Sequence, residues 1–68
     1  MTITVNGEEK TLPAEEITVE GLLEQLEVDM PGMVSVELND KIVSRSNHSV
    51  TNVNDGDRIE FLYFMGGG

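Results

Sequence analysis

The residues whose types and position could do chemistry are the three glycines at the end of the sequence, Gly66, Gly67 and Gly68. A terminal carboxylate is ionised at neutral pH and can attack the α-phosphate of ATP to give an acyl adenylate. Glycine has no Cβ, so a glycine tail can pass through a narrow channel. We therefore predict that the Gly68 carboxylate is the reactive group. The alternative is an idle end that frays.

Other kinds of chemical site find little support. The sequence has no cysteine, which excludes disulfides, thiolate zinc sites and cysteine nucleophiles. His48 has no partner at metal-ligand spacing and is expected to be exposed in a loop. No phosphate-binding glycine loop is present, so we expect this chain to bind no cofactor or metal, and any ATP and magnesium to be bound by a partner. We do not expect the chain to be an enzyme by itself.

Size and charge restrict the partners. The chain has 68 residues with 4 Lys+Arg against 13 Asp+Glu, a formal net charge of −9. Nucleic-acid binding needs a basic stripe, which is absent, and no apolar run approaches the length of a membrane span. We expect a soluble, cytoplasmic monomer without a leader segment, whose partner is a protein with a basic surface. The acidic residues lie mostly in the first half, where solvation is a simpler explanation than docking.

Period-2 and period-3.6 patterns predict one helix among several strands. The Asn6-Gly7 dipeptide is a strong hairpin signal, and Thr18 is placed as the N-cap of a helix over 19–27. Ile17 and Leu22 are spaced as a hydrophobic staple. The sequence gives no evident reason for a glycine at position 21, inside the helix. Strands are expected at 1–5, 8–12, 34–38, 41–43 and 58–64.

One helix can cover only one face of a sheet, so we predict an α+β domain in which a mixed four- to five-stranded sheet wraps over the helix. The domain is expected to span 1–64, followed by a flexible tail over 65–68. In the last strand Ile59 and Phe61 fall on one side, and Leu62 and Phe64 fall on the other. Leu62 and Phe64, together with Met65, are therefore candidates for partner docking, unless the 44–57 segment covers them.

The sequence resembles the small ubiquitin-like sulfur carriers of thiamine biosynthesis, which have the β-grasp fold. The resemblance covers the whole chain. The segments that carry it are 3–7, Thr18-Val19 with Leu22-Leu23, 36–39, 42–46, Asp55-Gly56-Asp57 with Ile59-Glu60, and the terminal glycines. Ser44 stands where this family has proline.

The resemblance implies that an E1-like adenylyltransferase activates the Gly68 carboxylate with ATP and magnesium. A sulfur donor, such as a cysteine desulfurase or a rhodanese-type protein, then converts it to a thiocarboxylate, and thiazole synthase takes the sulfur. Gly67 and Gly68 are the central residues of this expectation, with Gly66 as a spacer. The alternatives are the small subunit of molybdopterin synthase, a ubiquitin-like modifier that forms isopeptide bonds, and a plain interaction domain.

Overall fold

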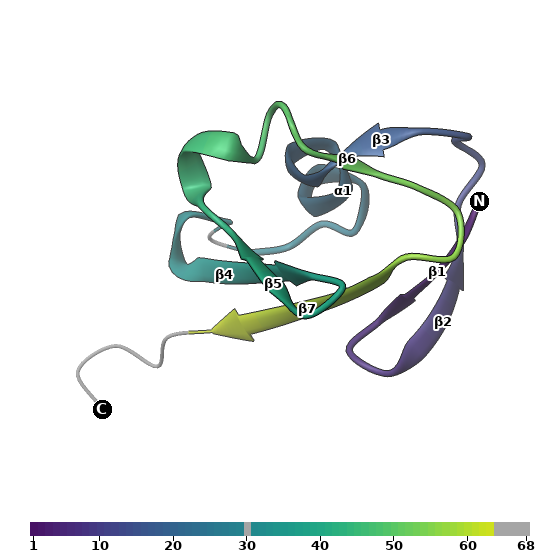
Figure 1. Ribbon diagram of the computed structural model, residues 1–68, viewed down its shortest axis with the longest axis horizontal. Coiled ribbons are helices and arrows are strands. Elements are labelled where there is room, and N and C mark those ends of the chain that lie inside the picture. Colours follow the sequence, from purple (N-terminus) through teal and green to yellow (C-terminus); the bar gives the residue numbers. More distant parts are fainter. Residues whose placement is uncertain (30, 64–68) are drawn as a thin grey trace.

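The computed structural model describes residues 1–29 and 31–63, in which a twisted sheet packs against one helix (Figure 1). The helix is α1 (Val19–Gln25), and two short 3-10 turns follow as η1 (Pro31–Met33) and η2 (Arg45–Asn47). The strands are β1 (Thr2–Val5), β2 (Glu8–Thr11), β3 (Ile17–Thr18), β4 (Val34–Leu38), β5 (Lys41–Val43), β6 (Asn52–Val53) and β7 (Arg58–Tyr63). The predicted order of elements is confirmed, with β3 and β6 as additions.

The main sheet has five strands in the order β2-β1-β7-β4-β5. β1 pairs with β7 in parallel, whereas the other neighbours in this sheet are antiparallel. The last strand of the described residues, β7, is therefore the middle strand of the sheet. β3 and β6 form a separate two-stranded sheet beside α1 (Figure 1). The predicted mixed sheet over one helix is confirmed.

Two tight turns follow from residues that tolerate a left-handed backbone. Asn6 and Gly7 have φ values of 50° and 83°, and Asn39 and Asp40 have values of 51° and 70°. Two consecutive residues with positive φ are typical of the type I′ turns that join adjacent antiparallel strands. The first turn joins β1 to β2, and the second joins β4 to β5. β2 is exposed throughout, as expected for an edge strand.

The helix begins as predicted and ends earlier. Thr18 Oγ1 accepts a hydrogen bond of 3.0 Å from the Gly21 N–H, which confirms the N-cap. At the other end, Glu27 adopts a φ of 54° and its N–H bonds to the Glu24 carbonyl. The Val28 N–H bonds back to the Leu23 carbonyl at 3.0 Å. These contacts form a Schellman motif, and so the helix stops at Gln25 instead of the predicted residue 27.

Gly21 has a packing reason that the sequence did not show. A Cβ at this position would lie 3.0 Å from Ile17 Cγ1 and 3.4 Å from Thr18 Oγ1. The first distance is tighter than nearly all Cβ contacts, so a larger residue would require the Ile17 side chain to move by a few tenths of an ångström. Gly21 therefore lets Ile17 lie against the helix and the core cluster.

The core lies between α1 and one face of the main sheet, to which β1, β4 and β7 contribute side chains. Its fully buried large side chains are Ile3, Val19, Leu22, Val36, Val53 and Ile59. They come from five elements, which include β6 of the small sheet. Because burial of apolar surface is the main favourable contribution to folding, this cluster fixes the helix on the sheet.

Candidate functional site

The candidate site is built around β7, since this strand leads directly into residues 64–68. β4 flanks one edge of β7 from Leu38↔Ile59 to Val34↔Tyr63. β1 flanks the other edge, where Thr4 pairs with Arg58 and Val5 pairs with Ile59. The strand that precedes the glycines is thus held at the centre of the sheet. Phe64, Met65, Gly66, Gly67 and Gly68 lie outside the described residues, and their proposed roles stay predictions.

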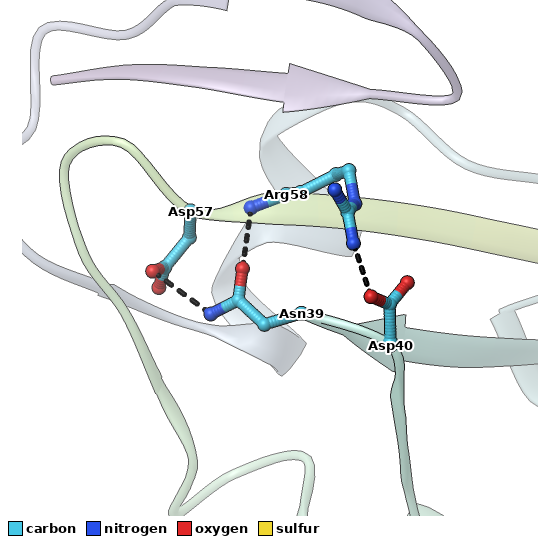
Figure 2. Close-up of polar contacts among 4 residues, drawn as sticks. All are labelled: Asn39, Asp40, Asp57 and Arg58. Carbon is cyan, nitrogen blue, oxygen red and sulfur yellow. Dashed lines mark hydrogen bonds and ion pairs between the residues drawn. The ribbon is translucent and has the colours of Figure 1, made fainter.

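Asn39 fixes the start of β7 through its backbone and its side chain (Figure 2). Its N–H donates to the Arg58 carbonyl at 2.8 Å, and its Oδ1 accepts from the Arg58 N–H at 2.9 Å. Its Nδ2 donates to Asp57 Oδ1 at 3.1 Å, while the Arg58 guanidinium pairs with Asp40. Figure 2 shows that these contacts join the β4–β5 turn to the loop before β7. They continue the β4–β7 ladder by one residue beyond Ile59.

Asn6 makes an equivalent contact on the other edge of β7. Its N–H donates to the Ile59 carbonyl at 2.9 Å, and its Oδ1 accepts from the Phe61 N–H at 2.8 Å. The side chain thus takes the place of the backbone carbonyl that β1 would supply if it continued. The sequence indicated Asn6 and Asn39 as turn residues only. Their second role could be suspected because asparagine combines a tolerance of positive φ with a short hydrogen-bonding side chain.

The face of the sheet opposite α1 carries exposed apolar side chains. Leu62 is 45% exposed and Ile42 is 70% exposed, while Ile59 and Phe61 are buried on the opposite side of β7. The predicted division of β7 into a core side and an open side is therefore confirmed, and the 44–57 segment does not bury Leu62. Ser35 lies opposite Leu62, and Glu37 lies opposite both Ile42 and Glu60. An apolar patch interrupted by two carboxylates suits a contact surface.

The prediction for His48 was wrong. Its side chain is only 7% exposed, and Nε2 lies 3.3 Å from the Val43 carbonyl oxygen. The His48 carbonyl also accepts a hydrogen bond of 3.0 Å from the Glu20 N–H in the first turn of α1. His48 thus joins the 44–51 segment to the helix. A polar side chain in a polar stretch gave no periodic signal for this burial.

Within the described parts of the chain, no group of three or more His, Cys, Asp or Glu side chains is placed to hold a metal ion. In the same ranges no helix combines the length and the apolar composition that a membrane crossing requires.

A mixed sheet on a single helix, with the last strand at its centre, defines a ubiquitin-like β-grasp domain. The model of the ThiS family matches residues 2–68. The chain therefore belongs to the ThiS family, which agrees with the resemblance seen in its sequence.

The solved structures that are similar to this chain include two of a thiamine biosynthesis protein from one organism. The crystal structure of the thiamine biosynthesis protein (ThiS) from Geobacter metallireducens is 48% identical, with a TM-score of 0.92 and full coverage of both chains. A solution structure of a thiamine biosynthesis protein from the same organism is 48% identical, with a TM-score of 0.83, covering all of this chain and 88% of that one.

The curated proteins are both named thiazole synthase. The protein from Paramagnetospirillum magneticum is 46% identical and the one from Magnetococcus marinus is 40% identical, each over all 68 residues of this chain. The chain spans only 20% of the length of each of these proteins. The comparisons favour the thiamine interpretation over the molybdopterin synthase and modifier alternatives.

Proposed function

We propose that Gly68 carries sulfur as a thiocarboxylate on its carbonyl carbon, and that thiazole synthase uses this sulfur in thiamine biosynthesis. The observation that carries the proposal is the match of the ThiS family model over residues 2–68, which include the three glycines that follow the central strand β7 in the sequence. The full-length similarity to the ThiS protein of Geobacter metallireducens supports it. The proposal places a free carboxylate on Gly68.

The chemistry proceeds by activation and displacement. An oxygen of the Gly68 carboxylate attacks the α-phosphorus of ATP on an E1-like adenylyltransferase, and pyrophosphate leaves with the bonding electrons. The persulfide sulfur of a cysteine desulfurase or a rhodanese-type protein then displaces AMP from the acyl carbon. A second thiol cleaves the acyl disulfide, which leaves the thiocarboxylate here and a disulfide on the donor. Since this chain has no cysteine, the persulfide and both thiols belong to partners.

ATP and magnesium are assigned to the adenylyltransferase in this proposal. The sequence contains no phosphate-binding glycine loop, and a carrier needs only to present its carboxylate. This chain is thereby a substrate of the partner enzymes and not a catalyst.

The folded domain contributes position and docking. We assign 1–64 to the domain and 65–68 to the tail, which reaches at most about 14 Å when extended. That length lets Gly68 enter a partner's active site while the domain stays outside. Asn6 and Asn39 fix β7, and so they define the point from which the tail starts. Leu62, with Phe64 and Met65 beyond it, supplies an apolar contact, and the net charge of −9 steers a basic partner.

Intact-mass spectrometry tests the proposal. The chain is incubated with the cognate adenylyltransferase, ATP, magnesium and the sulfur donor, and with the same mixture lacking ATP as the control. We expect a product heavier by one sulfur-for-oxygen exchange, about 16 Da, in the complete mixture only. A protein that stays unchanged in the complete mixture would contradict the proposal. Higher-mass conjugates in a cell lysate would support protein modification instead.

A further inference from the structure

The C-terminal half of β7 has one free edge. β1 pairs with β7 only at Thr4–Val5 before the chain turns at Asn6, whereas β4 accompanies β7 as far as Tyr63. Within the described residues, no strand therefore lies beside residues 61–63 on the β1 side. A free edge presents unpaired backbone groups to which another strand can add.

The hydrogen bonds of β7 identify these groups. The Asp57 and Ile59 carbonyls accept from the Thr4 and Asn6 N–H groups at 3.0 and 2.9 Å, so they face β1. The polar groups of successive strand residues point to alternate edges, and hence those of Phe61 and Tyr63 also face the β1 side. Asn6 Oδ1 takes the Phe61 N–H. The Phe61 carbonyl and the Tyr63 N–H then face the free edge.

A groove of about 470 Å³ lies at the Phe61 end of this edge, beside Asn6. Its apolar lining comes from Val5 and Phe61 on the sheet and from Leu26 and Val28 at the end of α1. Glu27 and Asp29 are exposed and line the same groove. The edge therefore combines backbone hydrogen-bonding groups with an apolar lining and two carboxylates.

The charges around the groove select its occupant. The groove is also lined by Glu8 and Lys10, which form an ion pair of 3.6 Å, so the lysine charge is offset locally. Glu27 and Asp29 thus leave an excess of negative charge. A second copy of this chain, with a net charge of −9, would be repelled. An extended segment with apolar and basic side chains fits the lining and the charge.

We propose that this groove binds an extended, basic segment of the enzyme that takes sulfur from the tail, and that the segment adds as a strand beside residues 61–63. The inference rests on the proposed function for the identity of that enzyme, for which thiazole synthase is the probe. A strand bound here would hold the chain at the residue from which the tail departs. The groove is separate from the open face that carries Leu62, which lies on the other side of β7.

Hydrogen exchange measures the edge directly. In the free protein the Tyr63 amide should exchange rapidly, and saturating thiazole synthase should slow it about tenfold or more. The amides of Glu60 and Leu62 face β4 and serve as internal controls, with little change expected. Rapid exchange of the Tyr63 amide in a complex that forms normally would overturn the inference. The inference would also be overturned if only the adenylyltransferase slowed exchange of the Tyr63 amide. The same holds if a higher concentration of this chain, without a partner, slowed that exchange.

Charge reversal tests the carboxylates. Glu27→Lys with Asp29→Lys should weaken binding to thiazole synthase about tenfold, mainly through a slower association that is sensitive to salt. The matched control is Glu15→Lys with Glu16→Lys, because these exposed residues lie outside the groove and give the same change in net charge. Equal affinities for the two double variants would contradict the inference.

Thiocarboxylate formation is measured on every variant and separates the two proposals. If the groove variant acquires sulfur normally but binds thiazole synthase more weakly than the control, both proposals are supported. If sulfur is acquired and the binding is equal, the groove inference fails while the carrier function stands. If the parent chain, which carries no substitution, acquires no sulfur, the proposed function fails.

Discussion

Replacement of Asn39 by alanine is expected to lower the free energy of unfolding by about 2 kcal/mol. The substitution removes an acceptor from the Arg58 N–H at 2.9 Å and a donor to Asp57 Oδ1 at 3.1 Å. It also places an alanine at a φ of 51°. The backbone contact from the Asn39 N–H to the Arg58 carbonyl remains in the variant.

The magnitude follows from two contributions. Both side-chain contacts are exposed, so water replaces them in part and each contributes about 0.5 kcal/mol, the lower end of the usual range. The left-handed conformation is unfavourable for alanine by about 1 kcal/mol relative to asparagine, which tolerates it. The sum is about 2 kcal/mol, a large fraction of the roughly 3–10 kcal/mol expected for a chain of this length.

Asn39→Gly separates the two contributions. Glycine loses the same hydrogen bonds but accepts positive φ, so we expect a loss of about 1 kcal/mol. Urea denaturation of the two variants and the parent, with m-values compared, measures both effects. Equal losses in the alanine and glycine variants, or losses below about 0.5 kcal/mol in both, would refute the assigned roles of the side chain and the turn.

Four further substitutions test other parts of the structure. Leu22→Ala, at a side chain with 0% exposure, should lower stability by about 2–5 kcal/mol in urea denaturation, and a loss under about 0.5 would mean that the helix is misplaced. Thr18→Ala removes the cap of α1 and should lower stability by about 1 kcal/mol, which an unchanged midpoint would contradict. Glu27→Gly relieves a left-handed residue at the end of α1 and should raise stability by about 0.5–1 kcal/mol; a loss would show that the Glu27 side chain stabilises this end. Leu62→Ser should weaken binding to the adenylyltransferase in calorimetric titration and change stability little. The matched control is Val50→Ser, at a side chain that is 72% exposed elsewhere on the surface. Equal affinities of the two variants would show that the exposed face with Leu62 does not bind the adenylyltransferase.

Local signals in the sequence were sufficient for most of the fold. The Asn6-Gly7 turn, the Thr18 cap and the alternation in β4 and β7 each predicted a structure that is present. The small β3–β6 sheet was missed because two-residue strands such as Ile17–Thr18 have no measurable periodicity. The end of the helix was predicted two residues too late. Glu27 has the left-handed conformation that follows the helix, and this position is usually recognised in a sequence because glycine occupies it.

The contacts around β7 needed the tertiary structure. Residues 6 and 61 are far apart in the sequence, so the bond from the Phe61 N–H to Asn6 Oδ1 could not be deduced from either position. The burial of His48 also depends on the path of the chain over α1. The alternation of Leu62 with its neighbours, by contrast, is a local property, and its exposure was predicted correctly.

The most direct test of the carrier function is the position of the Gly68 carboxylate. Deleting Gly68 moves the carboxylate back by up to about 3.6 Å, and appending one alanine moves it forward by a similar distance. Since a displacement of about 1 Å can slow a positioned reaction about 100-fold, pyrophosphate exchange with the cognate adenylyltransferase should fall at least that far in both variants. Urea denaturation should match that of the parent, because both changes leave every residue of the described core cluster in place. Normal exchange and normal sulfur acquisition by the protein lacking Gly68 would contradict the account.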